Sequence, residues 1–254
     1  MKNIFIFLFS FVILLEAHAQ KVVSYTDGNQ KLEGLIYSPK KDVANGNAVL
    51  LLPAWMGIEN NAKENATELA KLGYKTFVAD IYGIDKRPQS PNEAATIAGY
   101  YKTNIKDYQN RIQLALNELI KEGADPDKIA VIGYCFGGTG AIEAARTNMK
   151  VRGAVSFHGG LGRDSSRTIE PILTKVLVLH GADDFFVPGP EIKAFQDEMR
   201  TAKADWQMTY YANAVHAFTH KDAGNDKSIG TAYNEKAAKR SWQAMLDFFQ
   251  EIFK

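Results

Sequence analysis

The sequence has 254 residues, and its 30 Lys and Arg against 29 Asp and Glu leave a formal net charge of +1. A chain so close to neutral, with no basic run, gives no reason to expect nucleic acid or an anionic membrane surface as a partner. Its single cysteine excludes an intramolecular disulfide.

The first 19 residues have the pattern of a signal peptide. Lys2 supplies a short positive region, residues 4–15 are almost entirely apolar, and residues 17–19 (Ala-His-Ala) have the small-x-small pattern of a signal-peptidase site. We expect cleavage after Ala19 and export to the periplasm or the medium. Stable membrane insertion is not expected, because a spanning helix needs ~20 apolar residues; an uncleaved anchor is the alternative.

The next part of the chain predicts an antiparallel hairpin followed by a β-α-β unit. The hairpin strands flank Asp27-Gly28-Asn29, which is a turn signal. A later apolar run has no polar alternation, as in a strand covered on both faces, and a helical pattern after it stops at Gly73. The expected elements are strands 21–25, 32–37, 47–52 and 76–79 and helix 60–72.

The same alternation continues to the end of the chain. Ser90-Pro91-Asn92-Glu93 combines capping-box residues with proline at the first helical position, and the apolar stripe that follows ends at Gly123. Further expected elements are strands 129–132, 151–157, 175–179 and 205–211, helix 191–202 and a last helix that contains Trp242 and Phe249. We therefore predict one α/β domain over residues 20–254, with a mostly parallel central sheet, helices on both faces and the antiparallel hairpin at its N-terminal edge.

The segment Gly133-Tyr134-Cys135-Phe136-Gly137-Gly138 lies between a predicted strand and a predicted helix. Strand, tight glycine-flanked turn and helix is the context of a nucleophile elbow, here with cysteine where serine usually stands. Gly133 and Gly137 let the strand and the helix approach without a Cβ clash. The alternative is that Cys135 is a buried core thiol.

Two strand-end loops supply partners for such a thiol, which needs a base and a group that orients the base. Asp183 and Asp184 follow the strand 175–179, and His216 follows the strand 205–211. The order nucleophile, acid, histidine is that of α/β-hydrolases. Either aspartate has the right chemistry, so the residues alone leave both as candidates.

With these motifs in place, the chain resembles the dienelactone hydrolase family of α/β-hydrolases. The family's G-Y-C-x-G-G matches residues 133–138, its G-x-x-D-x-x-V-P matches residues 181–188, and its G/A-x-H-x-F matches residues 214–218. Residues 72–83 also look like its L-G-Y…D-x-Y-G segment. The resemblance implies an α/β-hydrolase fold, with Cys135 as nucleophile, His216 as base and Asp184 as orienting acid.

The predicted chemistry is hydrolysis of a small-molecule ester or lactone through an acyl-thiol intermediate. Backbone N–H groups must then face the developing oxyanion. We expect them at Phe136, the residue after the nucleophile, and at Trp55, after the strand 47–52; Trp55 as a packed wall residue is the alternative. No metal or organic cofactor is expected.

The sequence departs from the members of the family that act on dienelactone. Those members carry a glutamate where Ala54 stands here, and arginines that hold the substrate carboxylate. One arginine position is His220 in this chain, and the helical region 94–101 around the other contains no arginine, although Arg87 lies upstream. A lactone that bears a carboxylate is therefore not favoured as substrate.

The remaining candidates are pocket residues and alternative functions. His158, Phe185 and His220 are expected to line the pocket, with structural hydrogen bonding as the alternative for His158. A zinc site could be drawn from His216, His220 and an aspartate, but no H-E-x-x-H or cysteine-pair spacing supports one. A non-hydrolytic acyltransferase or a thiol-based binding or sensor protein is the alternative function. The protein is expected to be a monomer or a small homo-oligomer.

Overall fold

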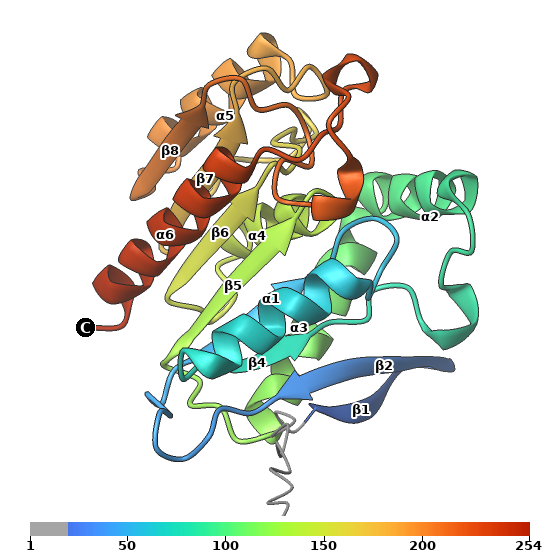
Figure 1. The fold of residues 1–254 in the computed structure, drawn as a ribbon, viewed down its shortest axis with the longest axis vertical. Helices are drawn as coiled ribbons and strands as arrows, with labels where there is room; N and C mark the ends of the chain where they lie inside the picture. Colours follow the sequence, from blue (N-terminus) through green and yellow to red (C-terminus); the bar gives the residue numbers. More distant parts are fainter. Residues whose placement is uncertain (1–19) are drawn as a thin grey trace, which may run out of the picture.

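The computed structural model describes residues 20–254, so the predicted signal peptide lies outside the described residues. These residues form an eight-stranded sheet in the order β1-β2-β4-β3-β5-β6-β7-β8 (Figure 1). The strands are β1 (Gln20–Asp27), β2 (Gln30–Tyr37), β3 (Ala48–Leu52), β4 (Lys75–Val78), β5 (Ile129–Tyr134), β6 (Gly153–Phe157), β7 (Lys175–Gly181) and β8 (Trp206–Tyr211).

The direction of the strands agrees with the predicted architecture. Strands β1 and β2 form the expected antiparallel hairpin at one edge, and β2 pairs antiparallel with β4, with Leu35 opposite Val78. Every pairing from β4 through β3, β5, β6 and β7 to β8 is parallel. The carboxyl ends of β5, β7 and β8 therefore meet at the same edge of the sheet, where ligands bind in such folds.

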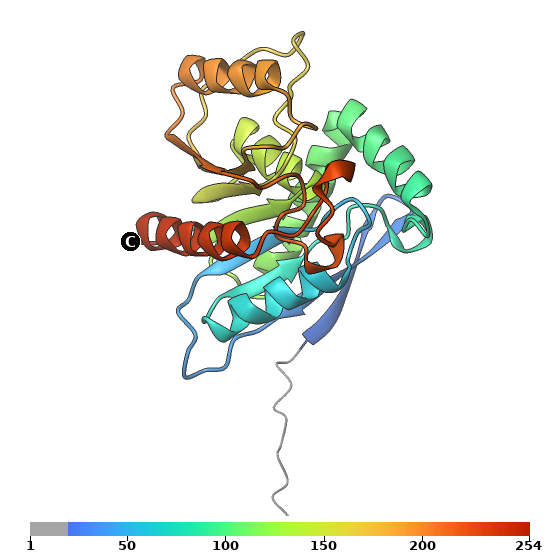
Figure 2. The ribbon, with the colours of Figure 1, turned by 45° about the horizontal axis from the view of Figure 1, so that its top comes forward.

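Helices cover both faces of the sheet, because each apolar face must be buried against another layer. Residues of α1 (Asn60–Lys71) and α6 (Glu235–Ile252) fill one core. Residues of α2 (Pro91–Thr103), α3 (Ile105–Lys121), α4 (Phe136–Arg146) and α5 (Gly189–Thr201) fill the other. Helices α5 and α6 lie on opposite sides of β7 and β8 (Figure 2). Short 3₁₀ turns complete the chain at Ile84–Lys86, Lys221–Ala223 and Lys227–Ile229.

The helical region after Ser90 is interrupted, which the apolar stripe does not reveal. The side chain of Ser90 caps α2 by accepting a hydrogen bond from the Glu93 N–H at 3.3 Å, as its pattern predicts. Asn104, however, leaves the helical conformation with φ −101° and ψ 64°, so α2 and α3 are separate helices. Strand β7 also runs two residues past its predicted end, because His180 and Gly181 pair with Tyr210 and Tyr211.

Over residues 20–254, the structure contains no helix that is both long and apolar enough to cross a membrane.

Candidate active site

Cys135 lies in the sharp turn between β5 and α4. Its backbone has φ 54° and ψ −113°, a strained conformation that nucleophile elbows use to expose the side chain. The turn is held because the Cys135 N–H donates to the Phe157 carbonyl at 3.0 Å and its own carbonyl accepts from the Thr139 N–H at 3.1 Å. Cys135 is half-buried, so the buried-thiol alternative does not describe its position.

Neither Gly133 nor Gly137 has room for a side chain, because neighbouring backbone lies where its Cβ would stand. A Cβ on Gly133 would overlap the backbone of Gly137, and a Cβ on Gly137 would overlap the Leu52 carbonyl. These close approaches let α4 start directly over the end of β5. The first turn of α4 therefore points its N-terminus, with its free N–H groups and positive dipole end, at the thiol.

The loops after β7 and β8 bring Asp184 and His216 to the thiol. Nε2 of His216 lies 3.0 Å from Sγ of Cys135, and Nδ1 lies 2.8 Å from Oδ2 of Asp184. The other carboxylate oxygen of Asp184 accepts from the Phe186 N–H at 3.0 Å, which fixes the acid. The neighbouring Asp183 is exposed, and only its backbone N–H is engaged, with the Ala214 carbonyl.

The backbone of His216 is tied to a later segment. Its N–H donates to the Gly230 carbonyl at 3.1 Å, and its carbonyl accepts from the Ala232 N–H at 3.2 Å. One face of the imidazole contacts the Phe186 ring, with centroids 5.5 Å apart. The ring is therefore positioned by two loops and by Asp184.

The electrostatics of the pair favour the proton on His216. Burial opposes charge on both groups, but the hydrogen bonds to Asp184 and Cys135 raise the pKa of His216 to about 10. Burial also acts against the thiolate, yet the hydrogen bond and charge of His216, with Lys102 and the Phe136 N–H, lower the pKa of Cys135. At neutral pH these directions favour a thiolate–imidazolium pair.

The two expected oxyanion donors lie in the elbow itself and in the turn after β3. Phe136 is the first residue of α4, and its N–H is one of the groups that lower the pKa of Cys135. Trp55 lies in the turn after β3, which is closed by a hydrogen bond from the Gly57 N–H to the Ala54 carbonyl at 2.9 Å. Trp55 is 37 % exposed and lines a cavity of about 580 Å³, which is also the position of a wall residue.

His158 lies behind the candidate triad instead of lining a cavity wall. It is fully buried with φ 40°, and its Nε2 lies 2.8 Å from the Thr219 hydroxyl. The ring is 5.2 Å from His216 and 5.4 Å from His220 between centroids. Burial lowers the pKa of His158 well below the usual range and that of His220 to about 4, and the charge of His216 acts in the same direction.

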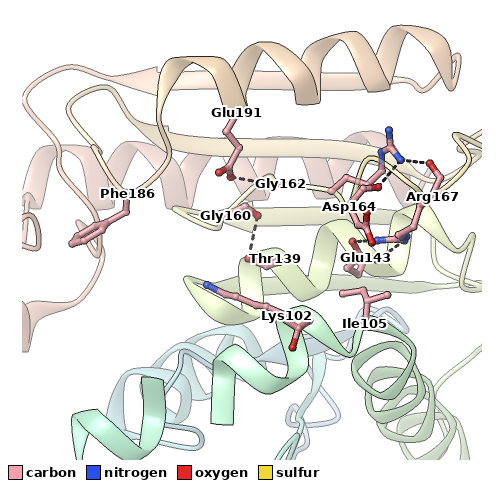
Figure 3. A pocket seen from close by; sticks show the side chains of 12 residues that line it. Lys102, Ile105, Thr139, Glu143, Gly160, Gly162, Asp164, Arg167, Phe186 and Glu191 are labelled. Carbon is pink, nitrogen blue, oxygen red and sulfur yellow. Dashed lines mark hydrogen bonds and ion pairs between the residues drawn. The ribbon is translucent and has the colours of Figure 1, made fainter. Parts of the chain in front are cut away.

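A cavity of about 620 Å³ lies near the candidate triad, although Cys135, Asp184 and His216 are not among the residues that line it. Figure 3 shows its lining. Phe186, which contacts His216, and Thr139, one turn along α4 from Cys135, are among its lining residues. The ammonium end of Lys102 points toward the side of the cavity where Phe186 lies. Glu191 accepts hydrogen bonds from the Leu161 and Gly162 N–H groups at 2.6 and 2.8 Å.

Buried ion pairs hold the opposite wall of this cavity. Arg146 bonds Glu143 of its own helix and Glu198 of α5, each at 2.7 Å, and also donates to the carbonyls of Leu161 and Gly162. Removing one member of a buried pair leaves an uncompensated charge, at a cost of about 3–5 kcal/mol. The wall is therefore rigid.

A second cavity, of about 580 Å³, touches the turn after β3 and the loop after His216. Trp55, Ala217 and His220 are among its lining residues, so His220 has the expected pocket position. Phe185 lines neither of these two cavities; it is 60 % exposed and contacts Phe186, with ring centroids 4.6 Å apart.

Arg87 does not face the candidate site. Its guanidinium pairs with Asp80 at 2.8 Å and donates to the Glu33 carbonyl, so it holds the segment after β4.

Sequence reasoning missed two residues near the thiol, Lys102 and Tyr82. Lys102 is the residue after the helical region 94–101, which contains no arginine, and it has no ion-pair partner among residues 20–254. Tyr82 belongs to a segment noticed only for its family likeness, yet its hydroxyl donates to the Trp55 carbonyl at 2.7 Å. Lys102 was overlooked because the sequence analysis considered only arginine as the substrate-binding cation. No local sequence signal marks Tyr82.

In the described part of the chain, His, Cys, Asp and Glu side chains nowhere gather in groups of three or more that could hold a metal ion.

The chain is similar in sequence and fold to several known proteins. A solved dienelactone hydrolase-like promiscuous phosphotriesterase from metagenomic libraries superimposes with a TM-score of 0.84 at 36% identity, covering 93% of this chain and 99% of that one. A protein of Aquifex aeolicus, named as a candidate carboxymethylenebutenolidase, is 26% identical over 240 residues, covering 92% of this chain and 99% of its own length. An uncharacterized protein of Caenorhabditis elegans is 32% identical over 146 residues, covering 56% of this chain and 92% of its own.

The family model described as Dienelactone hydrolase family matches residues 32–253, nearly the whole described chain. This match confirms the resemblance drawn from the elbow, acid-loop and histidine motifs. The chain belongs to the dienelactone hydrolase family and is an ester or lactone hydrolase with the α/β-hydrolase fold.

Proposed function

We propose that this hydrolase uses a Cys135–His216–Asp184 triad and passes through an acyl-thiol intermediate on Cys135. The observation that carries the proposal is the continuous hydrogen-bonded series from Asp184 through His216 to Sγ of Cys135. Its members come from three separate strand-end loops, and the nucleophile stands on a strained elbow. A core thiol needs none of this arrangement.

The reaction begins with the thiolate, because the proton of the pair resides on His216. The thiolate attacks the carbonyl carbon of the ester, and the carbonyl oxygen takes up the negative charge. The N–H groups of Phe136 and Trp55 stabilise this oxyanion. When the tetrahedral intermediate collapses, the C–O bond breaks and His216 gives its proton to the departing alkoxide.

Hydrolysis of the acyl-thiol completes the cycle. Neutral His216 removes a proton from a water molecule, which attacks the thioester carbonyl, and Asp184 stabilises the imidazolium that forms. The thiolate then leaves as the carboxylic acid is released, and the thiolate–imidazolium pair is restored. One water is consumed for each ester cleaved to acid and alcohol.

The direct test is release of p-nitrophenol from p-nitrophenyl acetate. We expect wild-type turnover, no enzymatic turnover in Cys135→Ala, and a fall of about 10²- to 10⁴-fold in His216→Ala. Equal rates in wild type and Cys135→Ala would contradict the proposal. A burst of one equivalent without turnover would favour an acyltransferase or a thiol sensor instead.

A phosphotriester is the second candidate substrate, because a neighbour at 36% identity is named as a promiscuous phosphotriesterase. A dialkyl p-nitrophenyl phosphate in the same assay tests it. Phosphotriester turnover that requires Cys135 would extend the substrate class, and its absence would restrict the chain to carbonyl esters.

We also propose that residues 1–19 are removed on export. The support is the sequence pattern alone: a charged start, an apolar run and Ala-His-Ala. Mass spectrometry of the exported protein is expected to give Gln20 as its first residue. A full-length chain found only in the membrane fraction would favour the uncleaved anchor.

A further inference from the structure

Tyr82 follows β4 and is held in place from behind by Asp80. One carboxylate oxygen of Asp80 accepts from the N–H groups of Tyr82 and Gly83, at 3.1 and 2.9 Å. The other oxygen forms the ion pair with Arg87 at 2.8 Å. Asp80 is itself buried, and its backbone N–H and carbonyl both bond the Tyr25 hydroxyl. The backbone of Tyr82 therefore has little freedom.

The hydroxyl of Tyr82 contacts one side of the proposed oxyanion hole. It donates to the Trp55 carbonyl at 2.7 Å. Trp55 and Met56 are the central residues of the turn that the Gly57-to-Ala54 hydrogen bond closes. The ring of Tyr82 also lies 3.7 Å from where a Cβ on Gly57 would stand. Tyr82 thus fixes the orientation of the turn that carries the Trp55 N–H.

The ring of Tyr82 contacts Phe136, the residue that carries the other expected oxyanion donor. It stacks on Phe136 with centroids 5.6 Å apart and an interplanar angle of 24°. Tyr108 stacks on Phe136 at 4.5 Å and donates its hydroxyl to the Phe136 carbonyl at 2.8 Å. Phe136 is thus anchored by Tyr108, and Tyr82 links it to the Trp55 turn.

The environment keeps the Tyr82 hydroxyl in its neutral, donating form. The side chain is 1 % exposed, and burial, followed by the nearby Cys135, raises its pKa above the usual range for tyrosine. A thiolate beside it does not deprotonate it. The hydroxyl remains a donor wherever the proposed triad works.

We propose that Tyr82 is a positioning residue for the oxyanion hole: its hydroxyl and its ring together hold the Trp55 and Phe136 N–H groups in one alignment. The inference rests on the proposed function, because the hole matters only if Cys135 forms a tetrahedral intermediate. Electrostatic stabilisation of this kind depends on donors that are aligned before the charge develops.

The test separates the oxyanion hole from the thiol. Tyr82→Phe keeps the stacked ring and removes only the hydrogen bond to Trp55. Acylation by p-nitrophenyl acetate, followed by stopped flow, needs the oxyanion hole, whereas alkylation by iodoacetamide is a displacement at a saturated carbon and needs only the thiolate. We expect acylation to slow by about 10-fold, less than the 10²–10³ for loss of a direct donor. At each pH the alkylation rate should stay within about 2-fold of the wild-type rate. The reason is that His216, Lys102 and the Phe136 N–H lower the pKa of Cys135, and Tyr82 is not among these groups.

Tyr101→Phe is the matched control. Tyr101 is a buried tyrosine whose ring lies 5.9 Å from Tyr82 and 6.4 Å from Phe136, but its hydroxyl does not bond the Trp55 turn. Both reactions are expected to proceed at wild-type rates in this variant. Phe136→Leu is a second variant that keeps the N–H donor and removes the stacked ring; acylation should slow while alkylation does not. It also serves if Tyr82→Phe fails to fold, as judged by thermal melting.

Two outcomes would overturn the inference. Wild-type acylation in folded Tyr82→Phe would show that the hydroxyl does not align the donors. A parallel fall of acylation and alkylation would mean that Tyr82 acts through the thiol or the fold. Failure of the proposed function would give a different result from failure of this inference. In that case Cys135→Ala would retain esterase turnover, independently of any substitution at Tyr82.

Discussion

Nδ1 of His216 lies 2.8 Å from Oδ2 of Asp184, whereas the adjacent aspartate, Asp183, turns its side chain to solvent. In the proposed triad this carboxylate would orient the imidazole and stabilise its charged form. Two chemically identical neighbours thus have different positions, and substitution distinguishes them.

Asp184→Asn is expected to lower kcat for p-nitrophenyl acetate by about 10²- to 10⁴-fold, because an amide neither stabilises the imidazolium nor fixes the tautomer. Asp183→Asn is the matched control and should retain wild-type kcat. Steady-state kinetics of the two variants side by side test this. A large loss in Asp183→Asn alone would assign the acid to the other residue.

Lys102→Met is expected to raise the pKa of Cys135, because the positive charge of Lys102 is one of the groups that lower it. The side chain is exposed and solvent screens it, so we expect a shift of about 0.2–0.5 unit. The pH dependence of iodoacetamide alkylation measures it. Compared with wild type, Lys102→Met should have a smaller fraction of Cys135 thiolate at each pH below the midpoint of the thiol titration.

Lys106→Met is the control for this charge. Lys106 is also exposed but lies in the first turn of α3, and it is not among the groups that shift the pKa of Cys135. Equal alkylation profiles for both variants would show that Lys102 exerts no particular effect on the thiol.

His220 should make the fold sensitive to acid. Its pKa is lowered to about 4 by burial and by the charge of His216, against the opposing effect of Asp222, while an unfolded histidine titrates near 6.5. The unfolded state therefore binds more protons below about pH 6.5, and the free energy of unfolding falls until about pH 4, by up to about 3 kcal/mol. His216 has a raised pKa and stays protonated in the folded state over this range. Its titration in the unfolded state near 6.5 therefore acts in the opposite direction above about pH 5.5, equally in wild type and in a His220 variant.

Urea unfolding of wild type and His220→Gln between about pH 7 and pH 4.5 checks this linkage. The variant should lose less stability than wild type across the range, because glutamine does not titrate. The residual slope includes His158 and His180, whose pKa values burial also lowers, and the opposing effect of His216. Identical slopes in the two proteins would refute a role for His220.

Gly137→Ala should disrupt the elbow, because the added Cβ would overlap the Leu52 carbonyl, which is backbone and cannot move aside cheaply. A loss of about 3 kcal/mol or more in the free energy of unfolding is expected, together with loss of esterase activity. Thermal melting and the p-nitrophenyl acetate assay measure both effects.

Gly99→Ala is the opposite case on α2, where a Cβ meets nothing within 4 Å. Alanine is the better helix former by up to about 1 kcal/mol, so this variant should be at least as stable as wild type. If both alanine variants melted alike, the steric account of Gly137 would be wrong.

Local sequence was enough to predict the fold class and the order of the candidate site. Glycine spacing marks the elbow at Cys135, because only glycine permits such close backbone approach. Apolar runs mark strands buried on both faces, and their ends locate the loops that carry Asp184 and His216. Helix periodicity hid the break at Asn104, since the apolar stripe continues on both sides of it.

Tertiary structure alone decided what those residues touch. The family spacing to Val187 favours Asp184 over Asp183, but only the folded chain shows which carboxylate reaches His216. His158 packs behind His216 because distant loops converge there, and Lys102 faces the cavity because α2 ends beside it. Tyr82 meets Trp55 and Phe136 only because β3, β4 and β5 are neighbours in the sheet. Periodicity records whether a residue is buried, but the identity of its partners depends on contacts far apart in the chain.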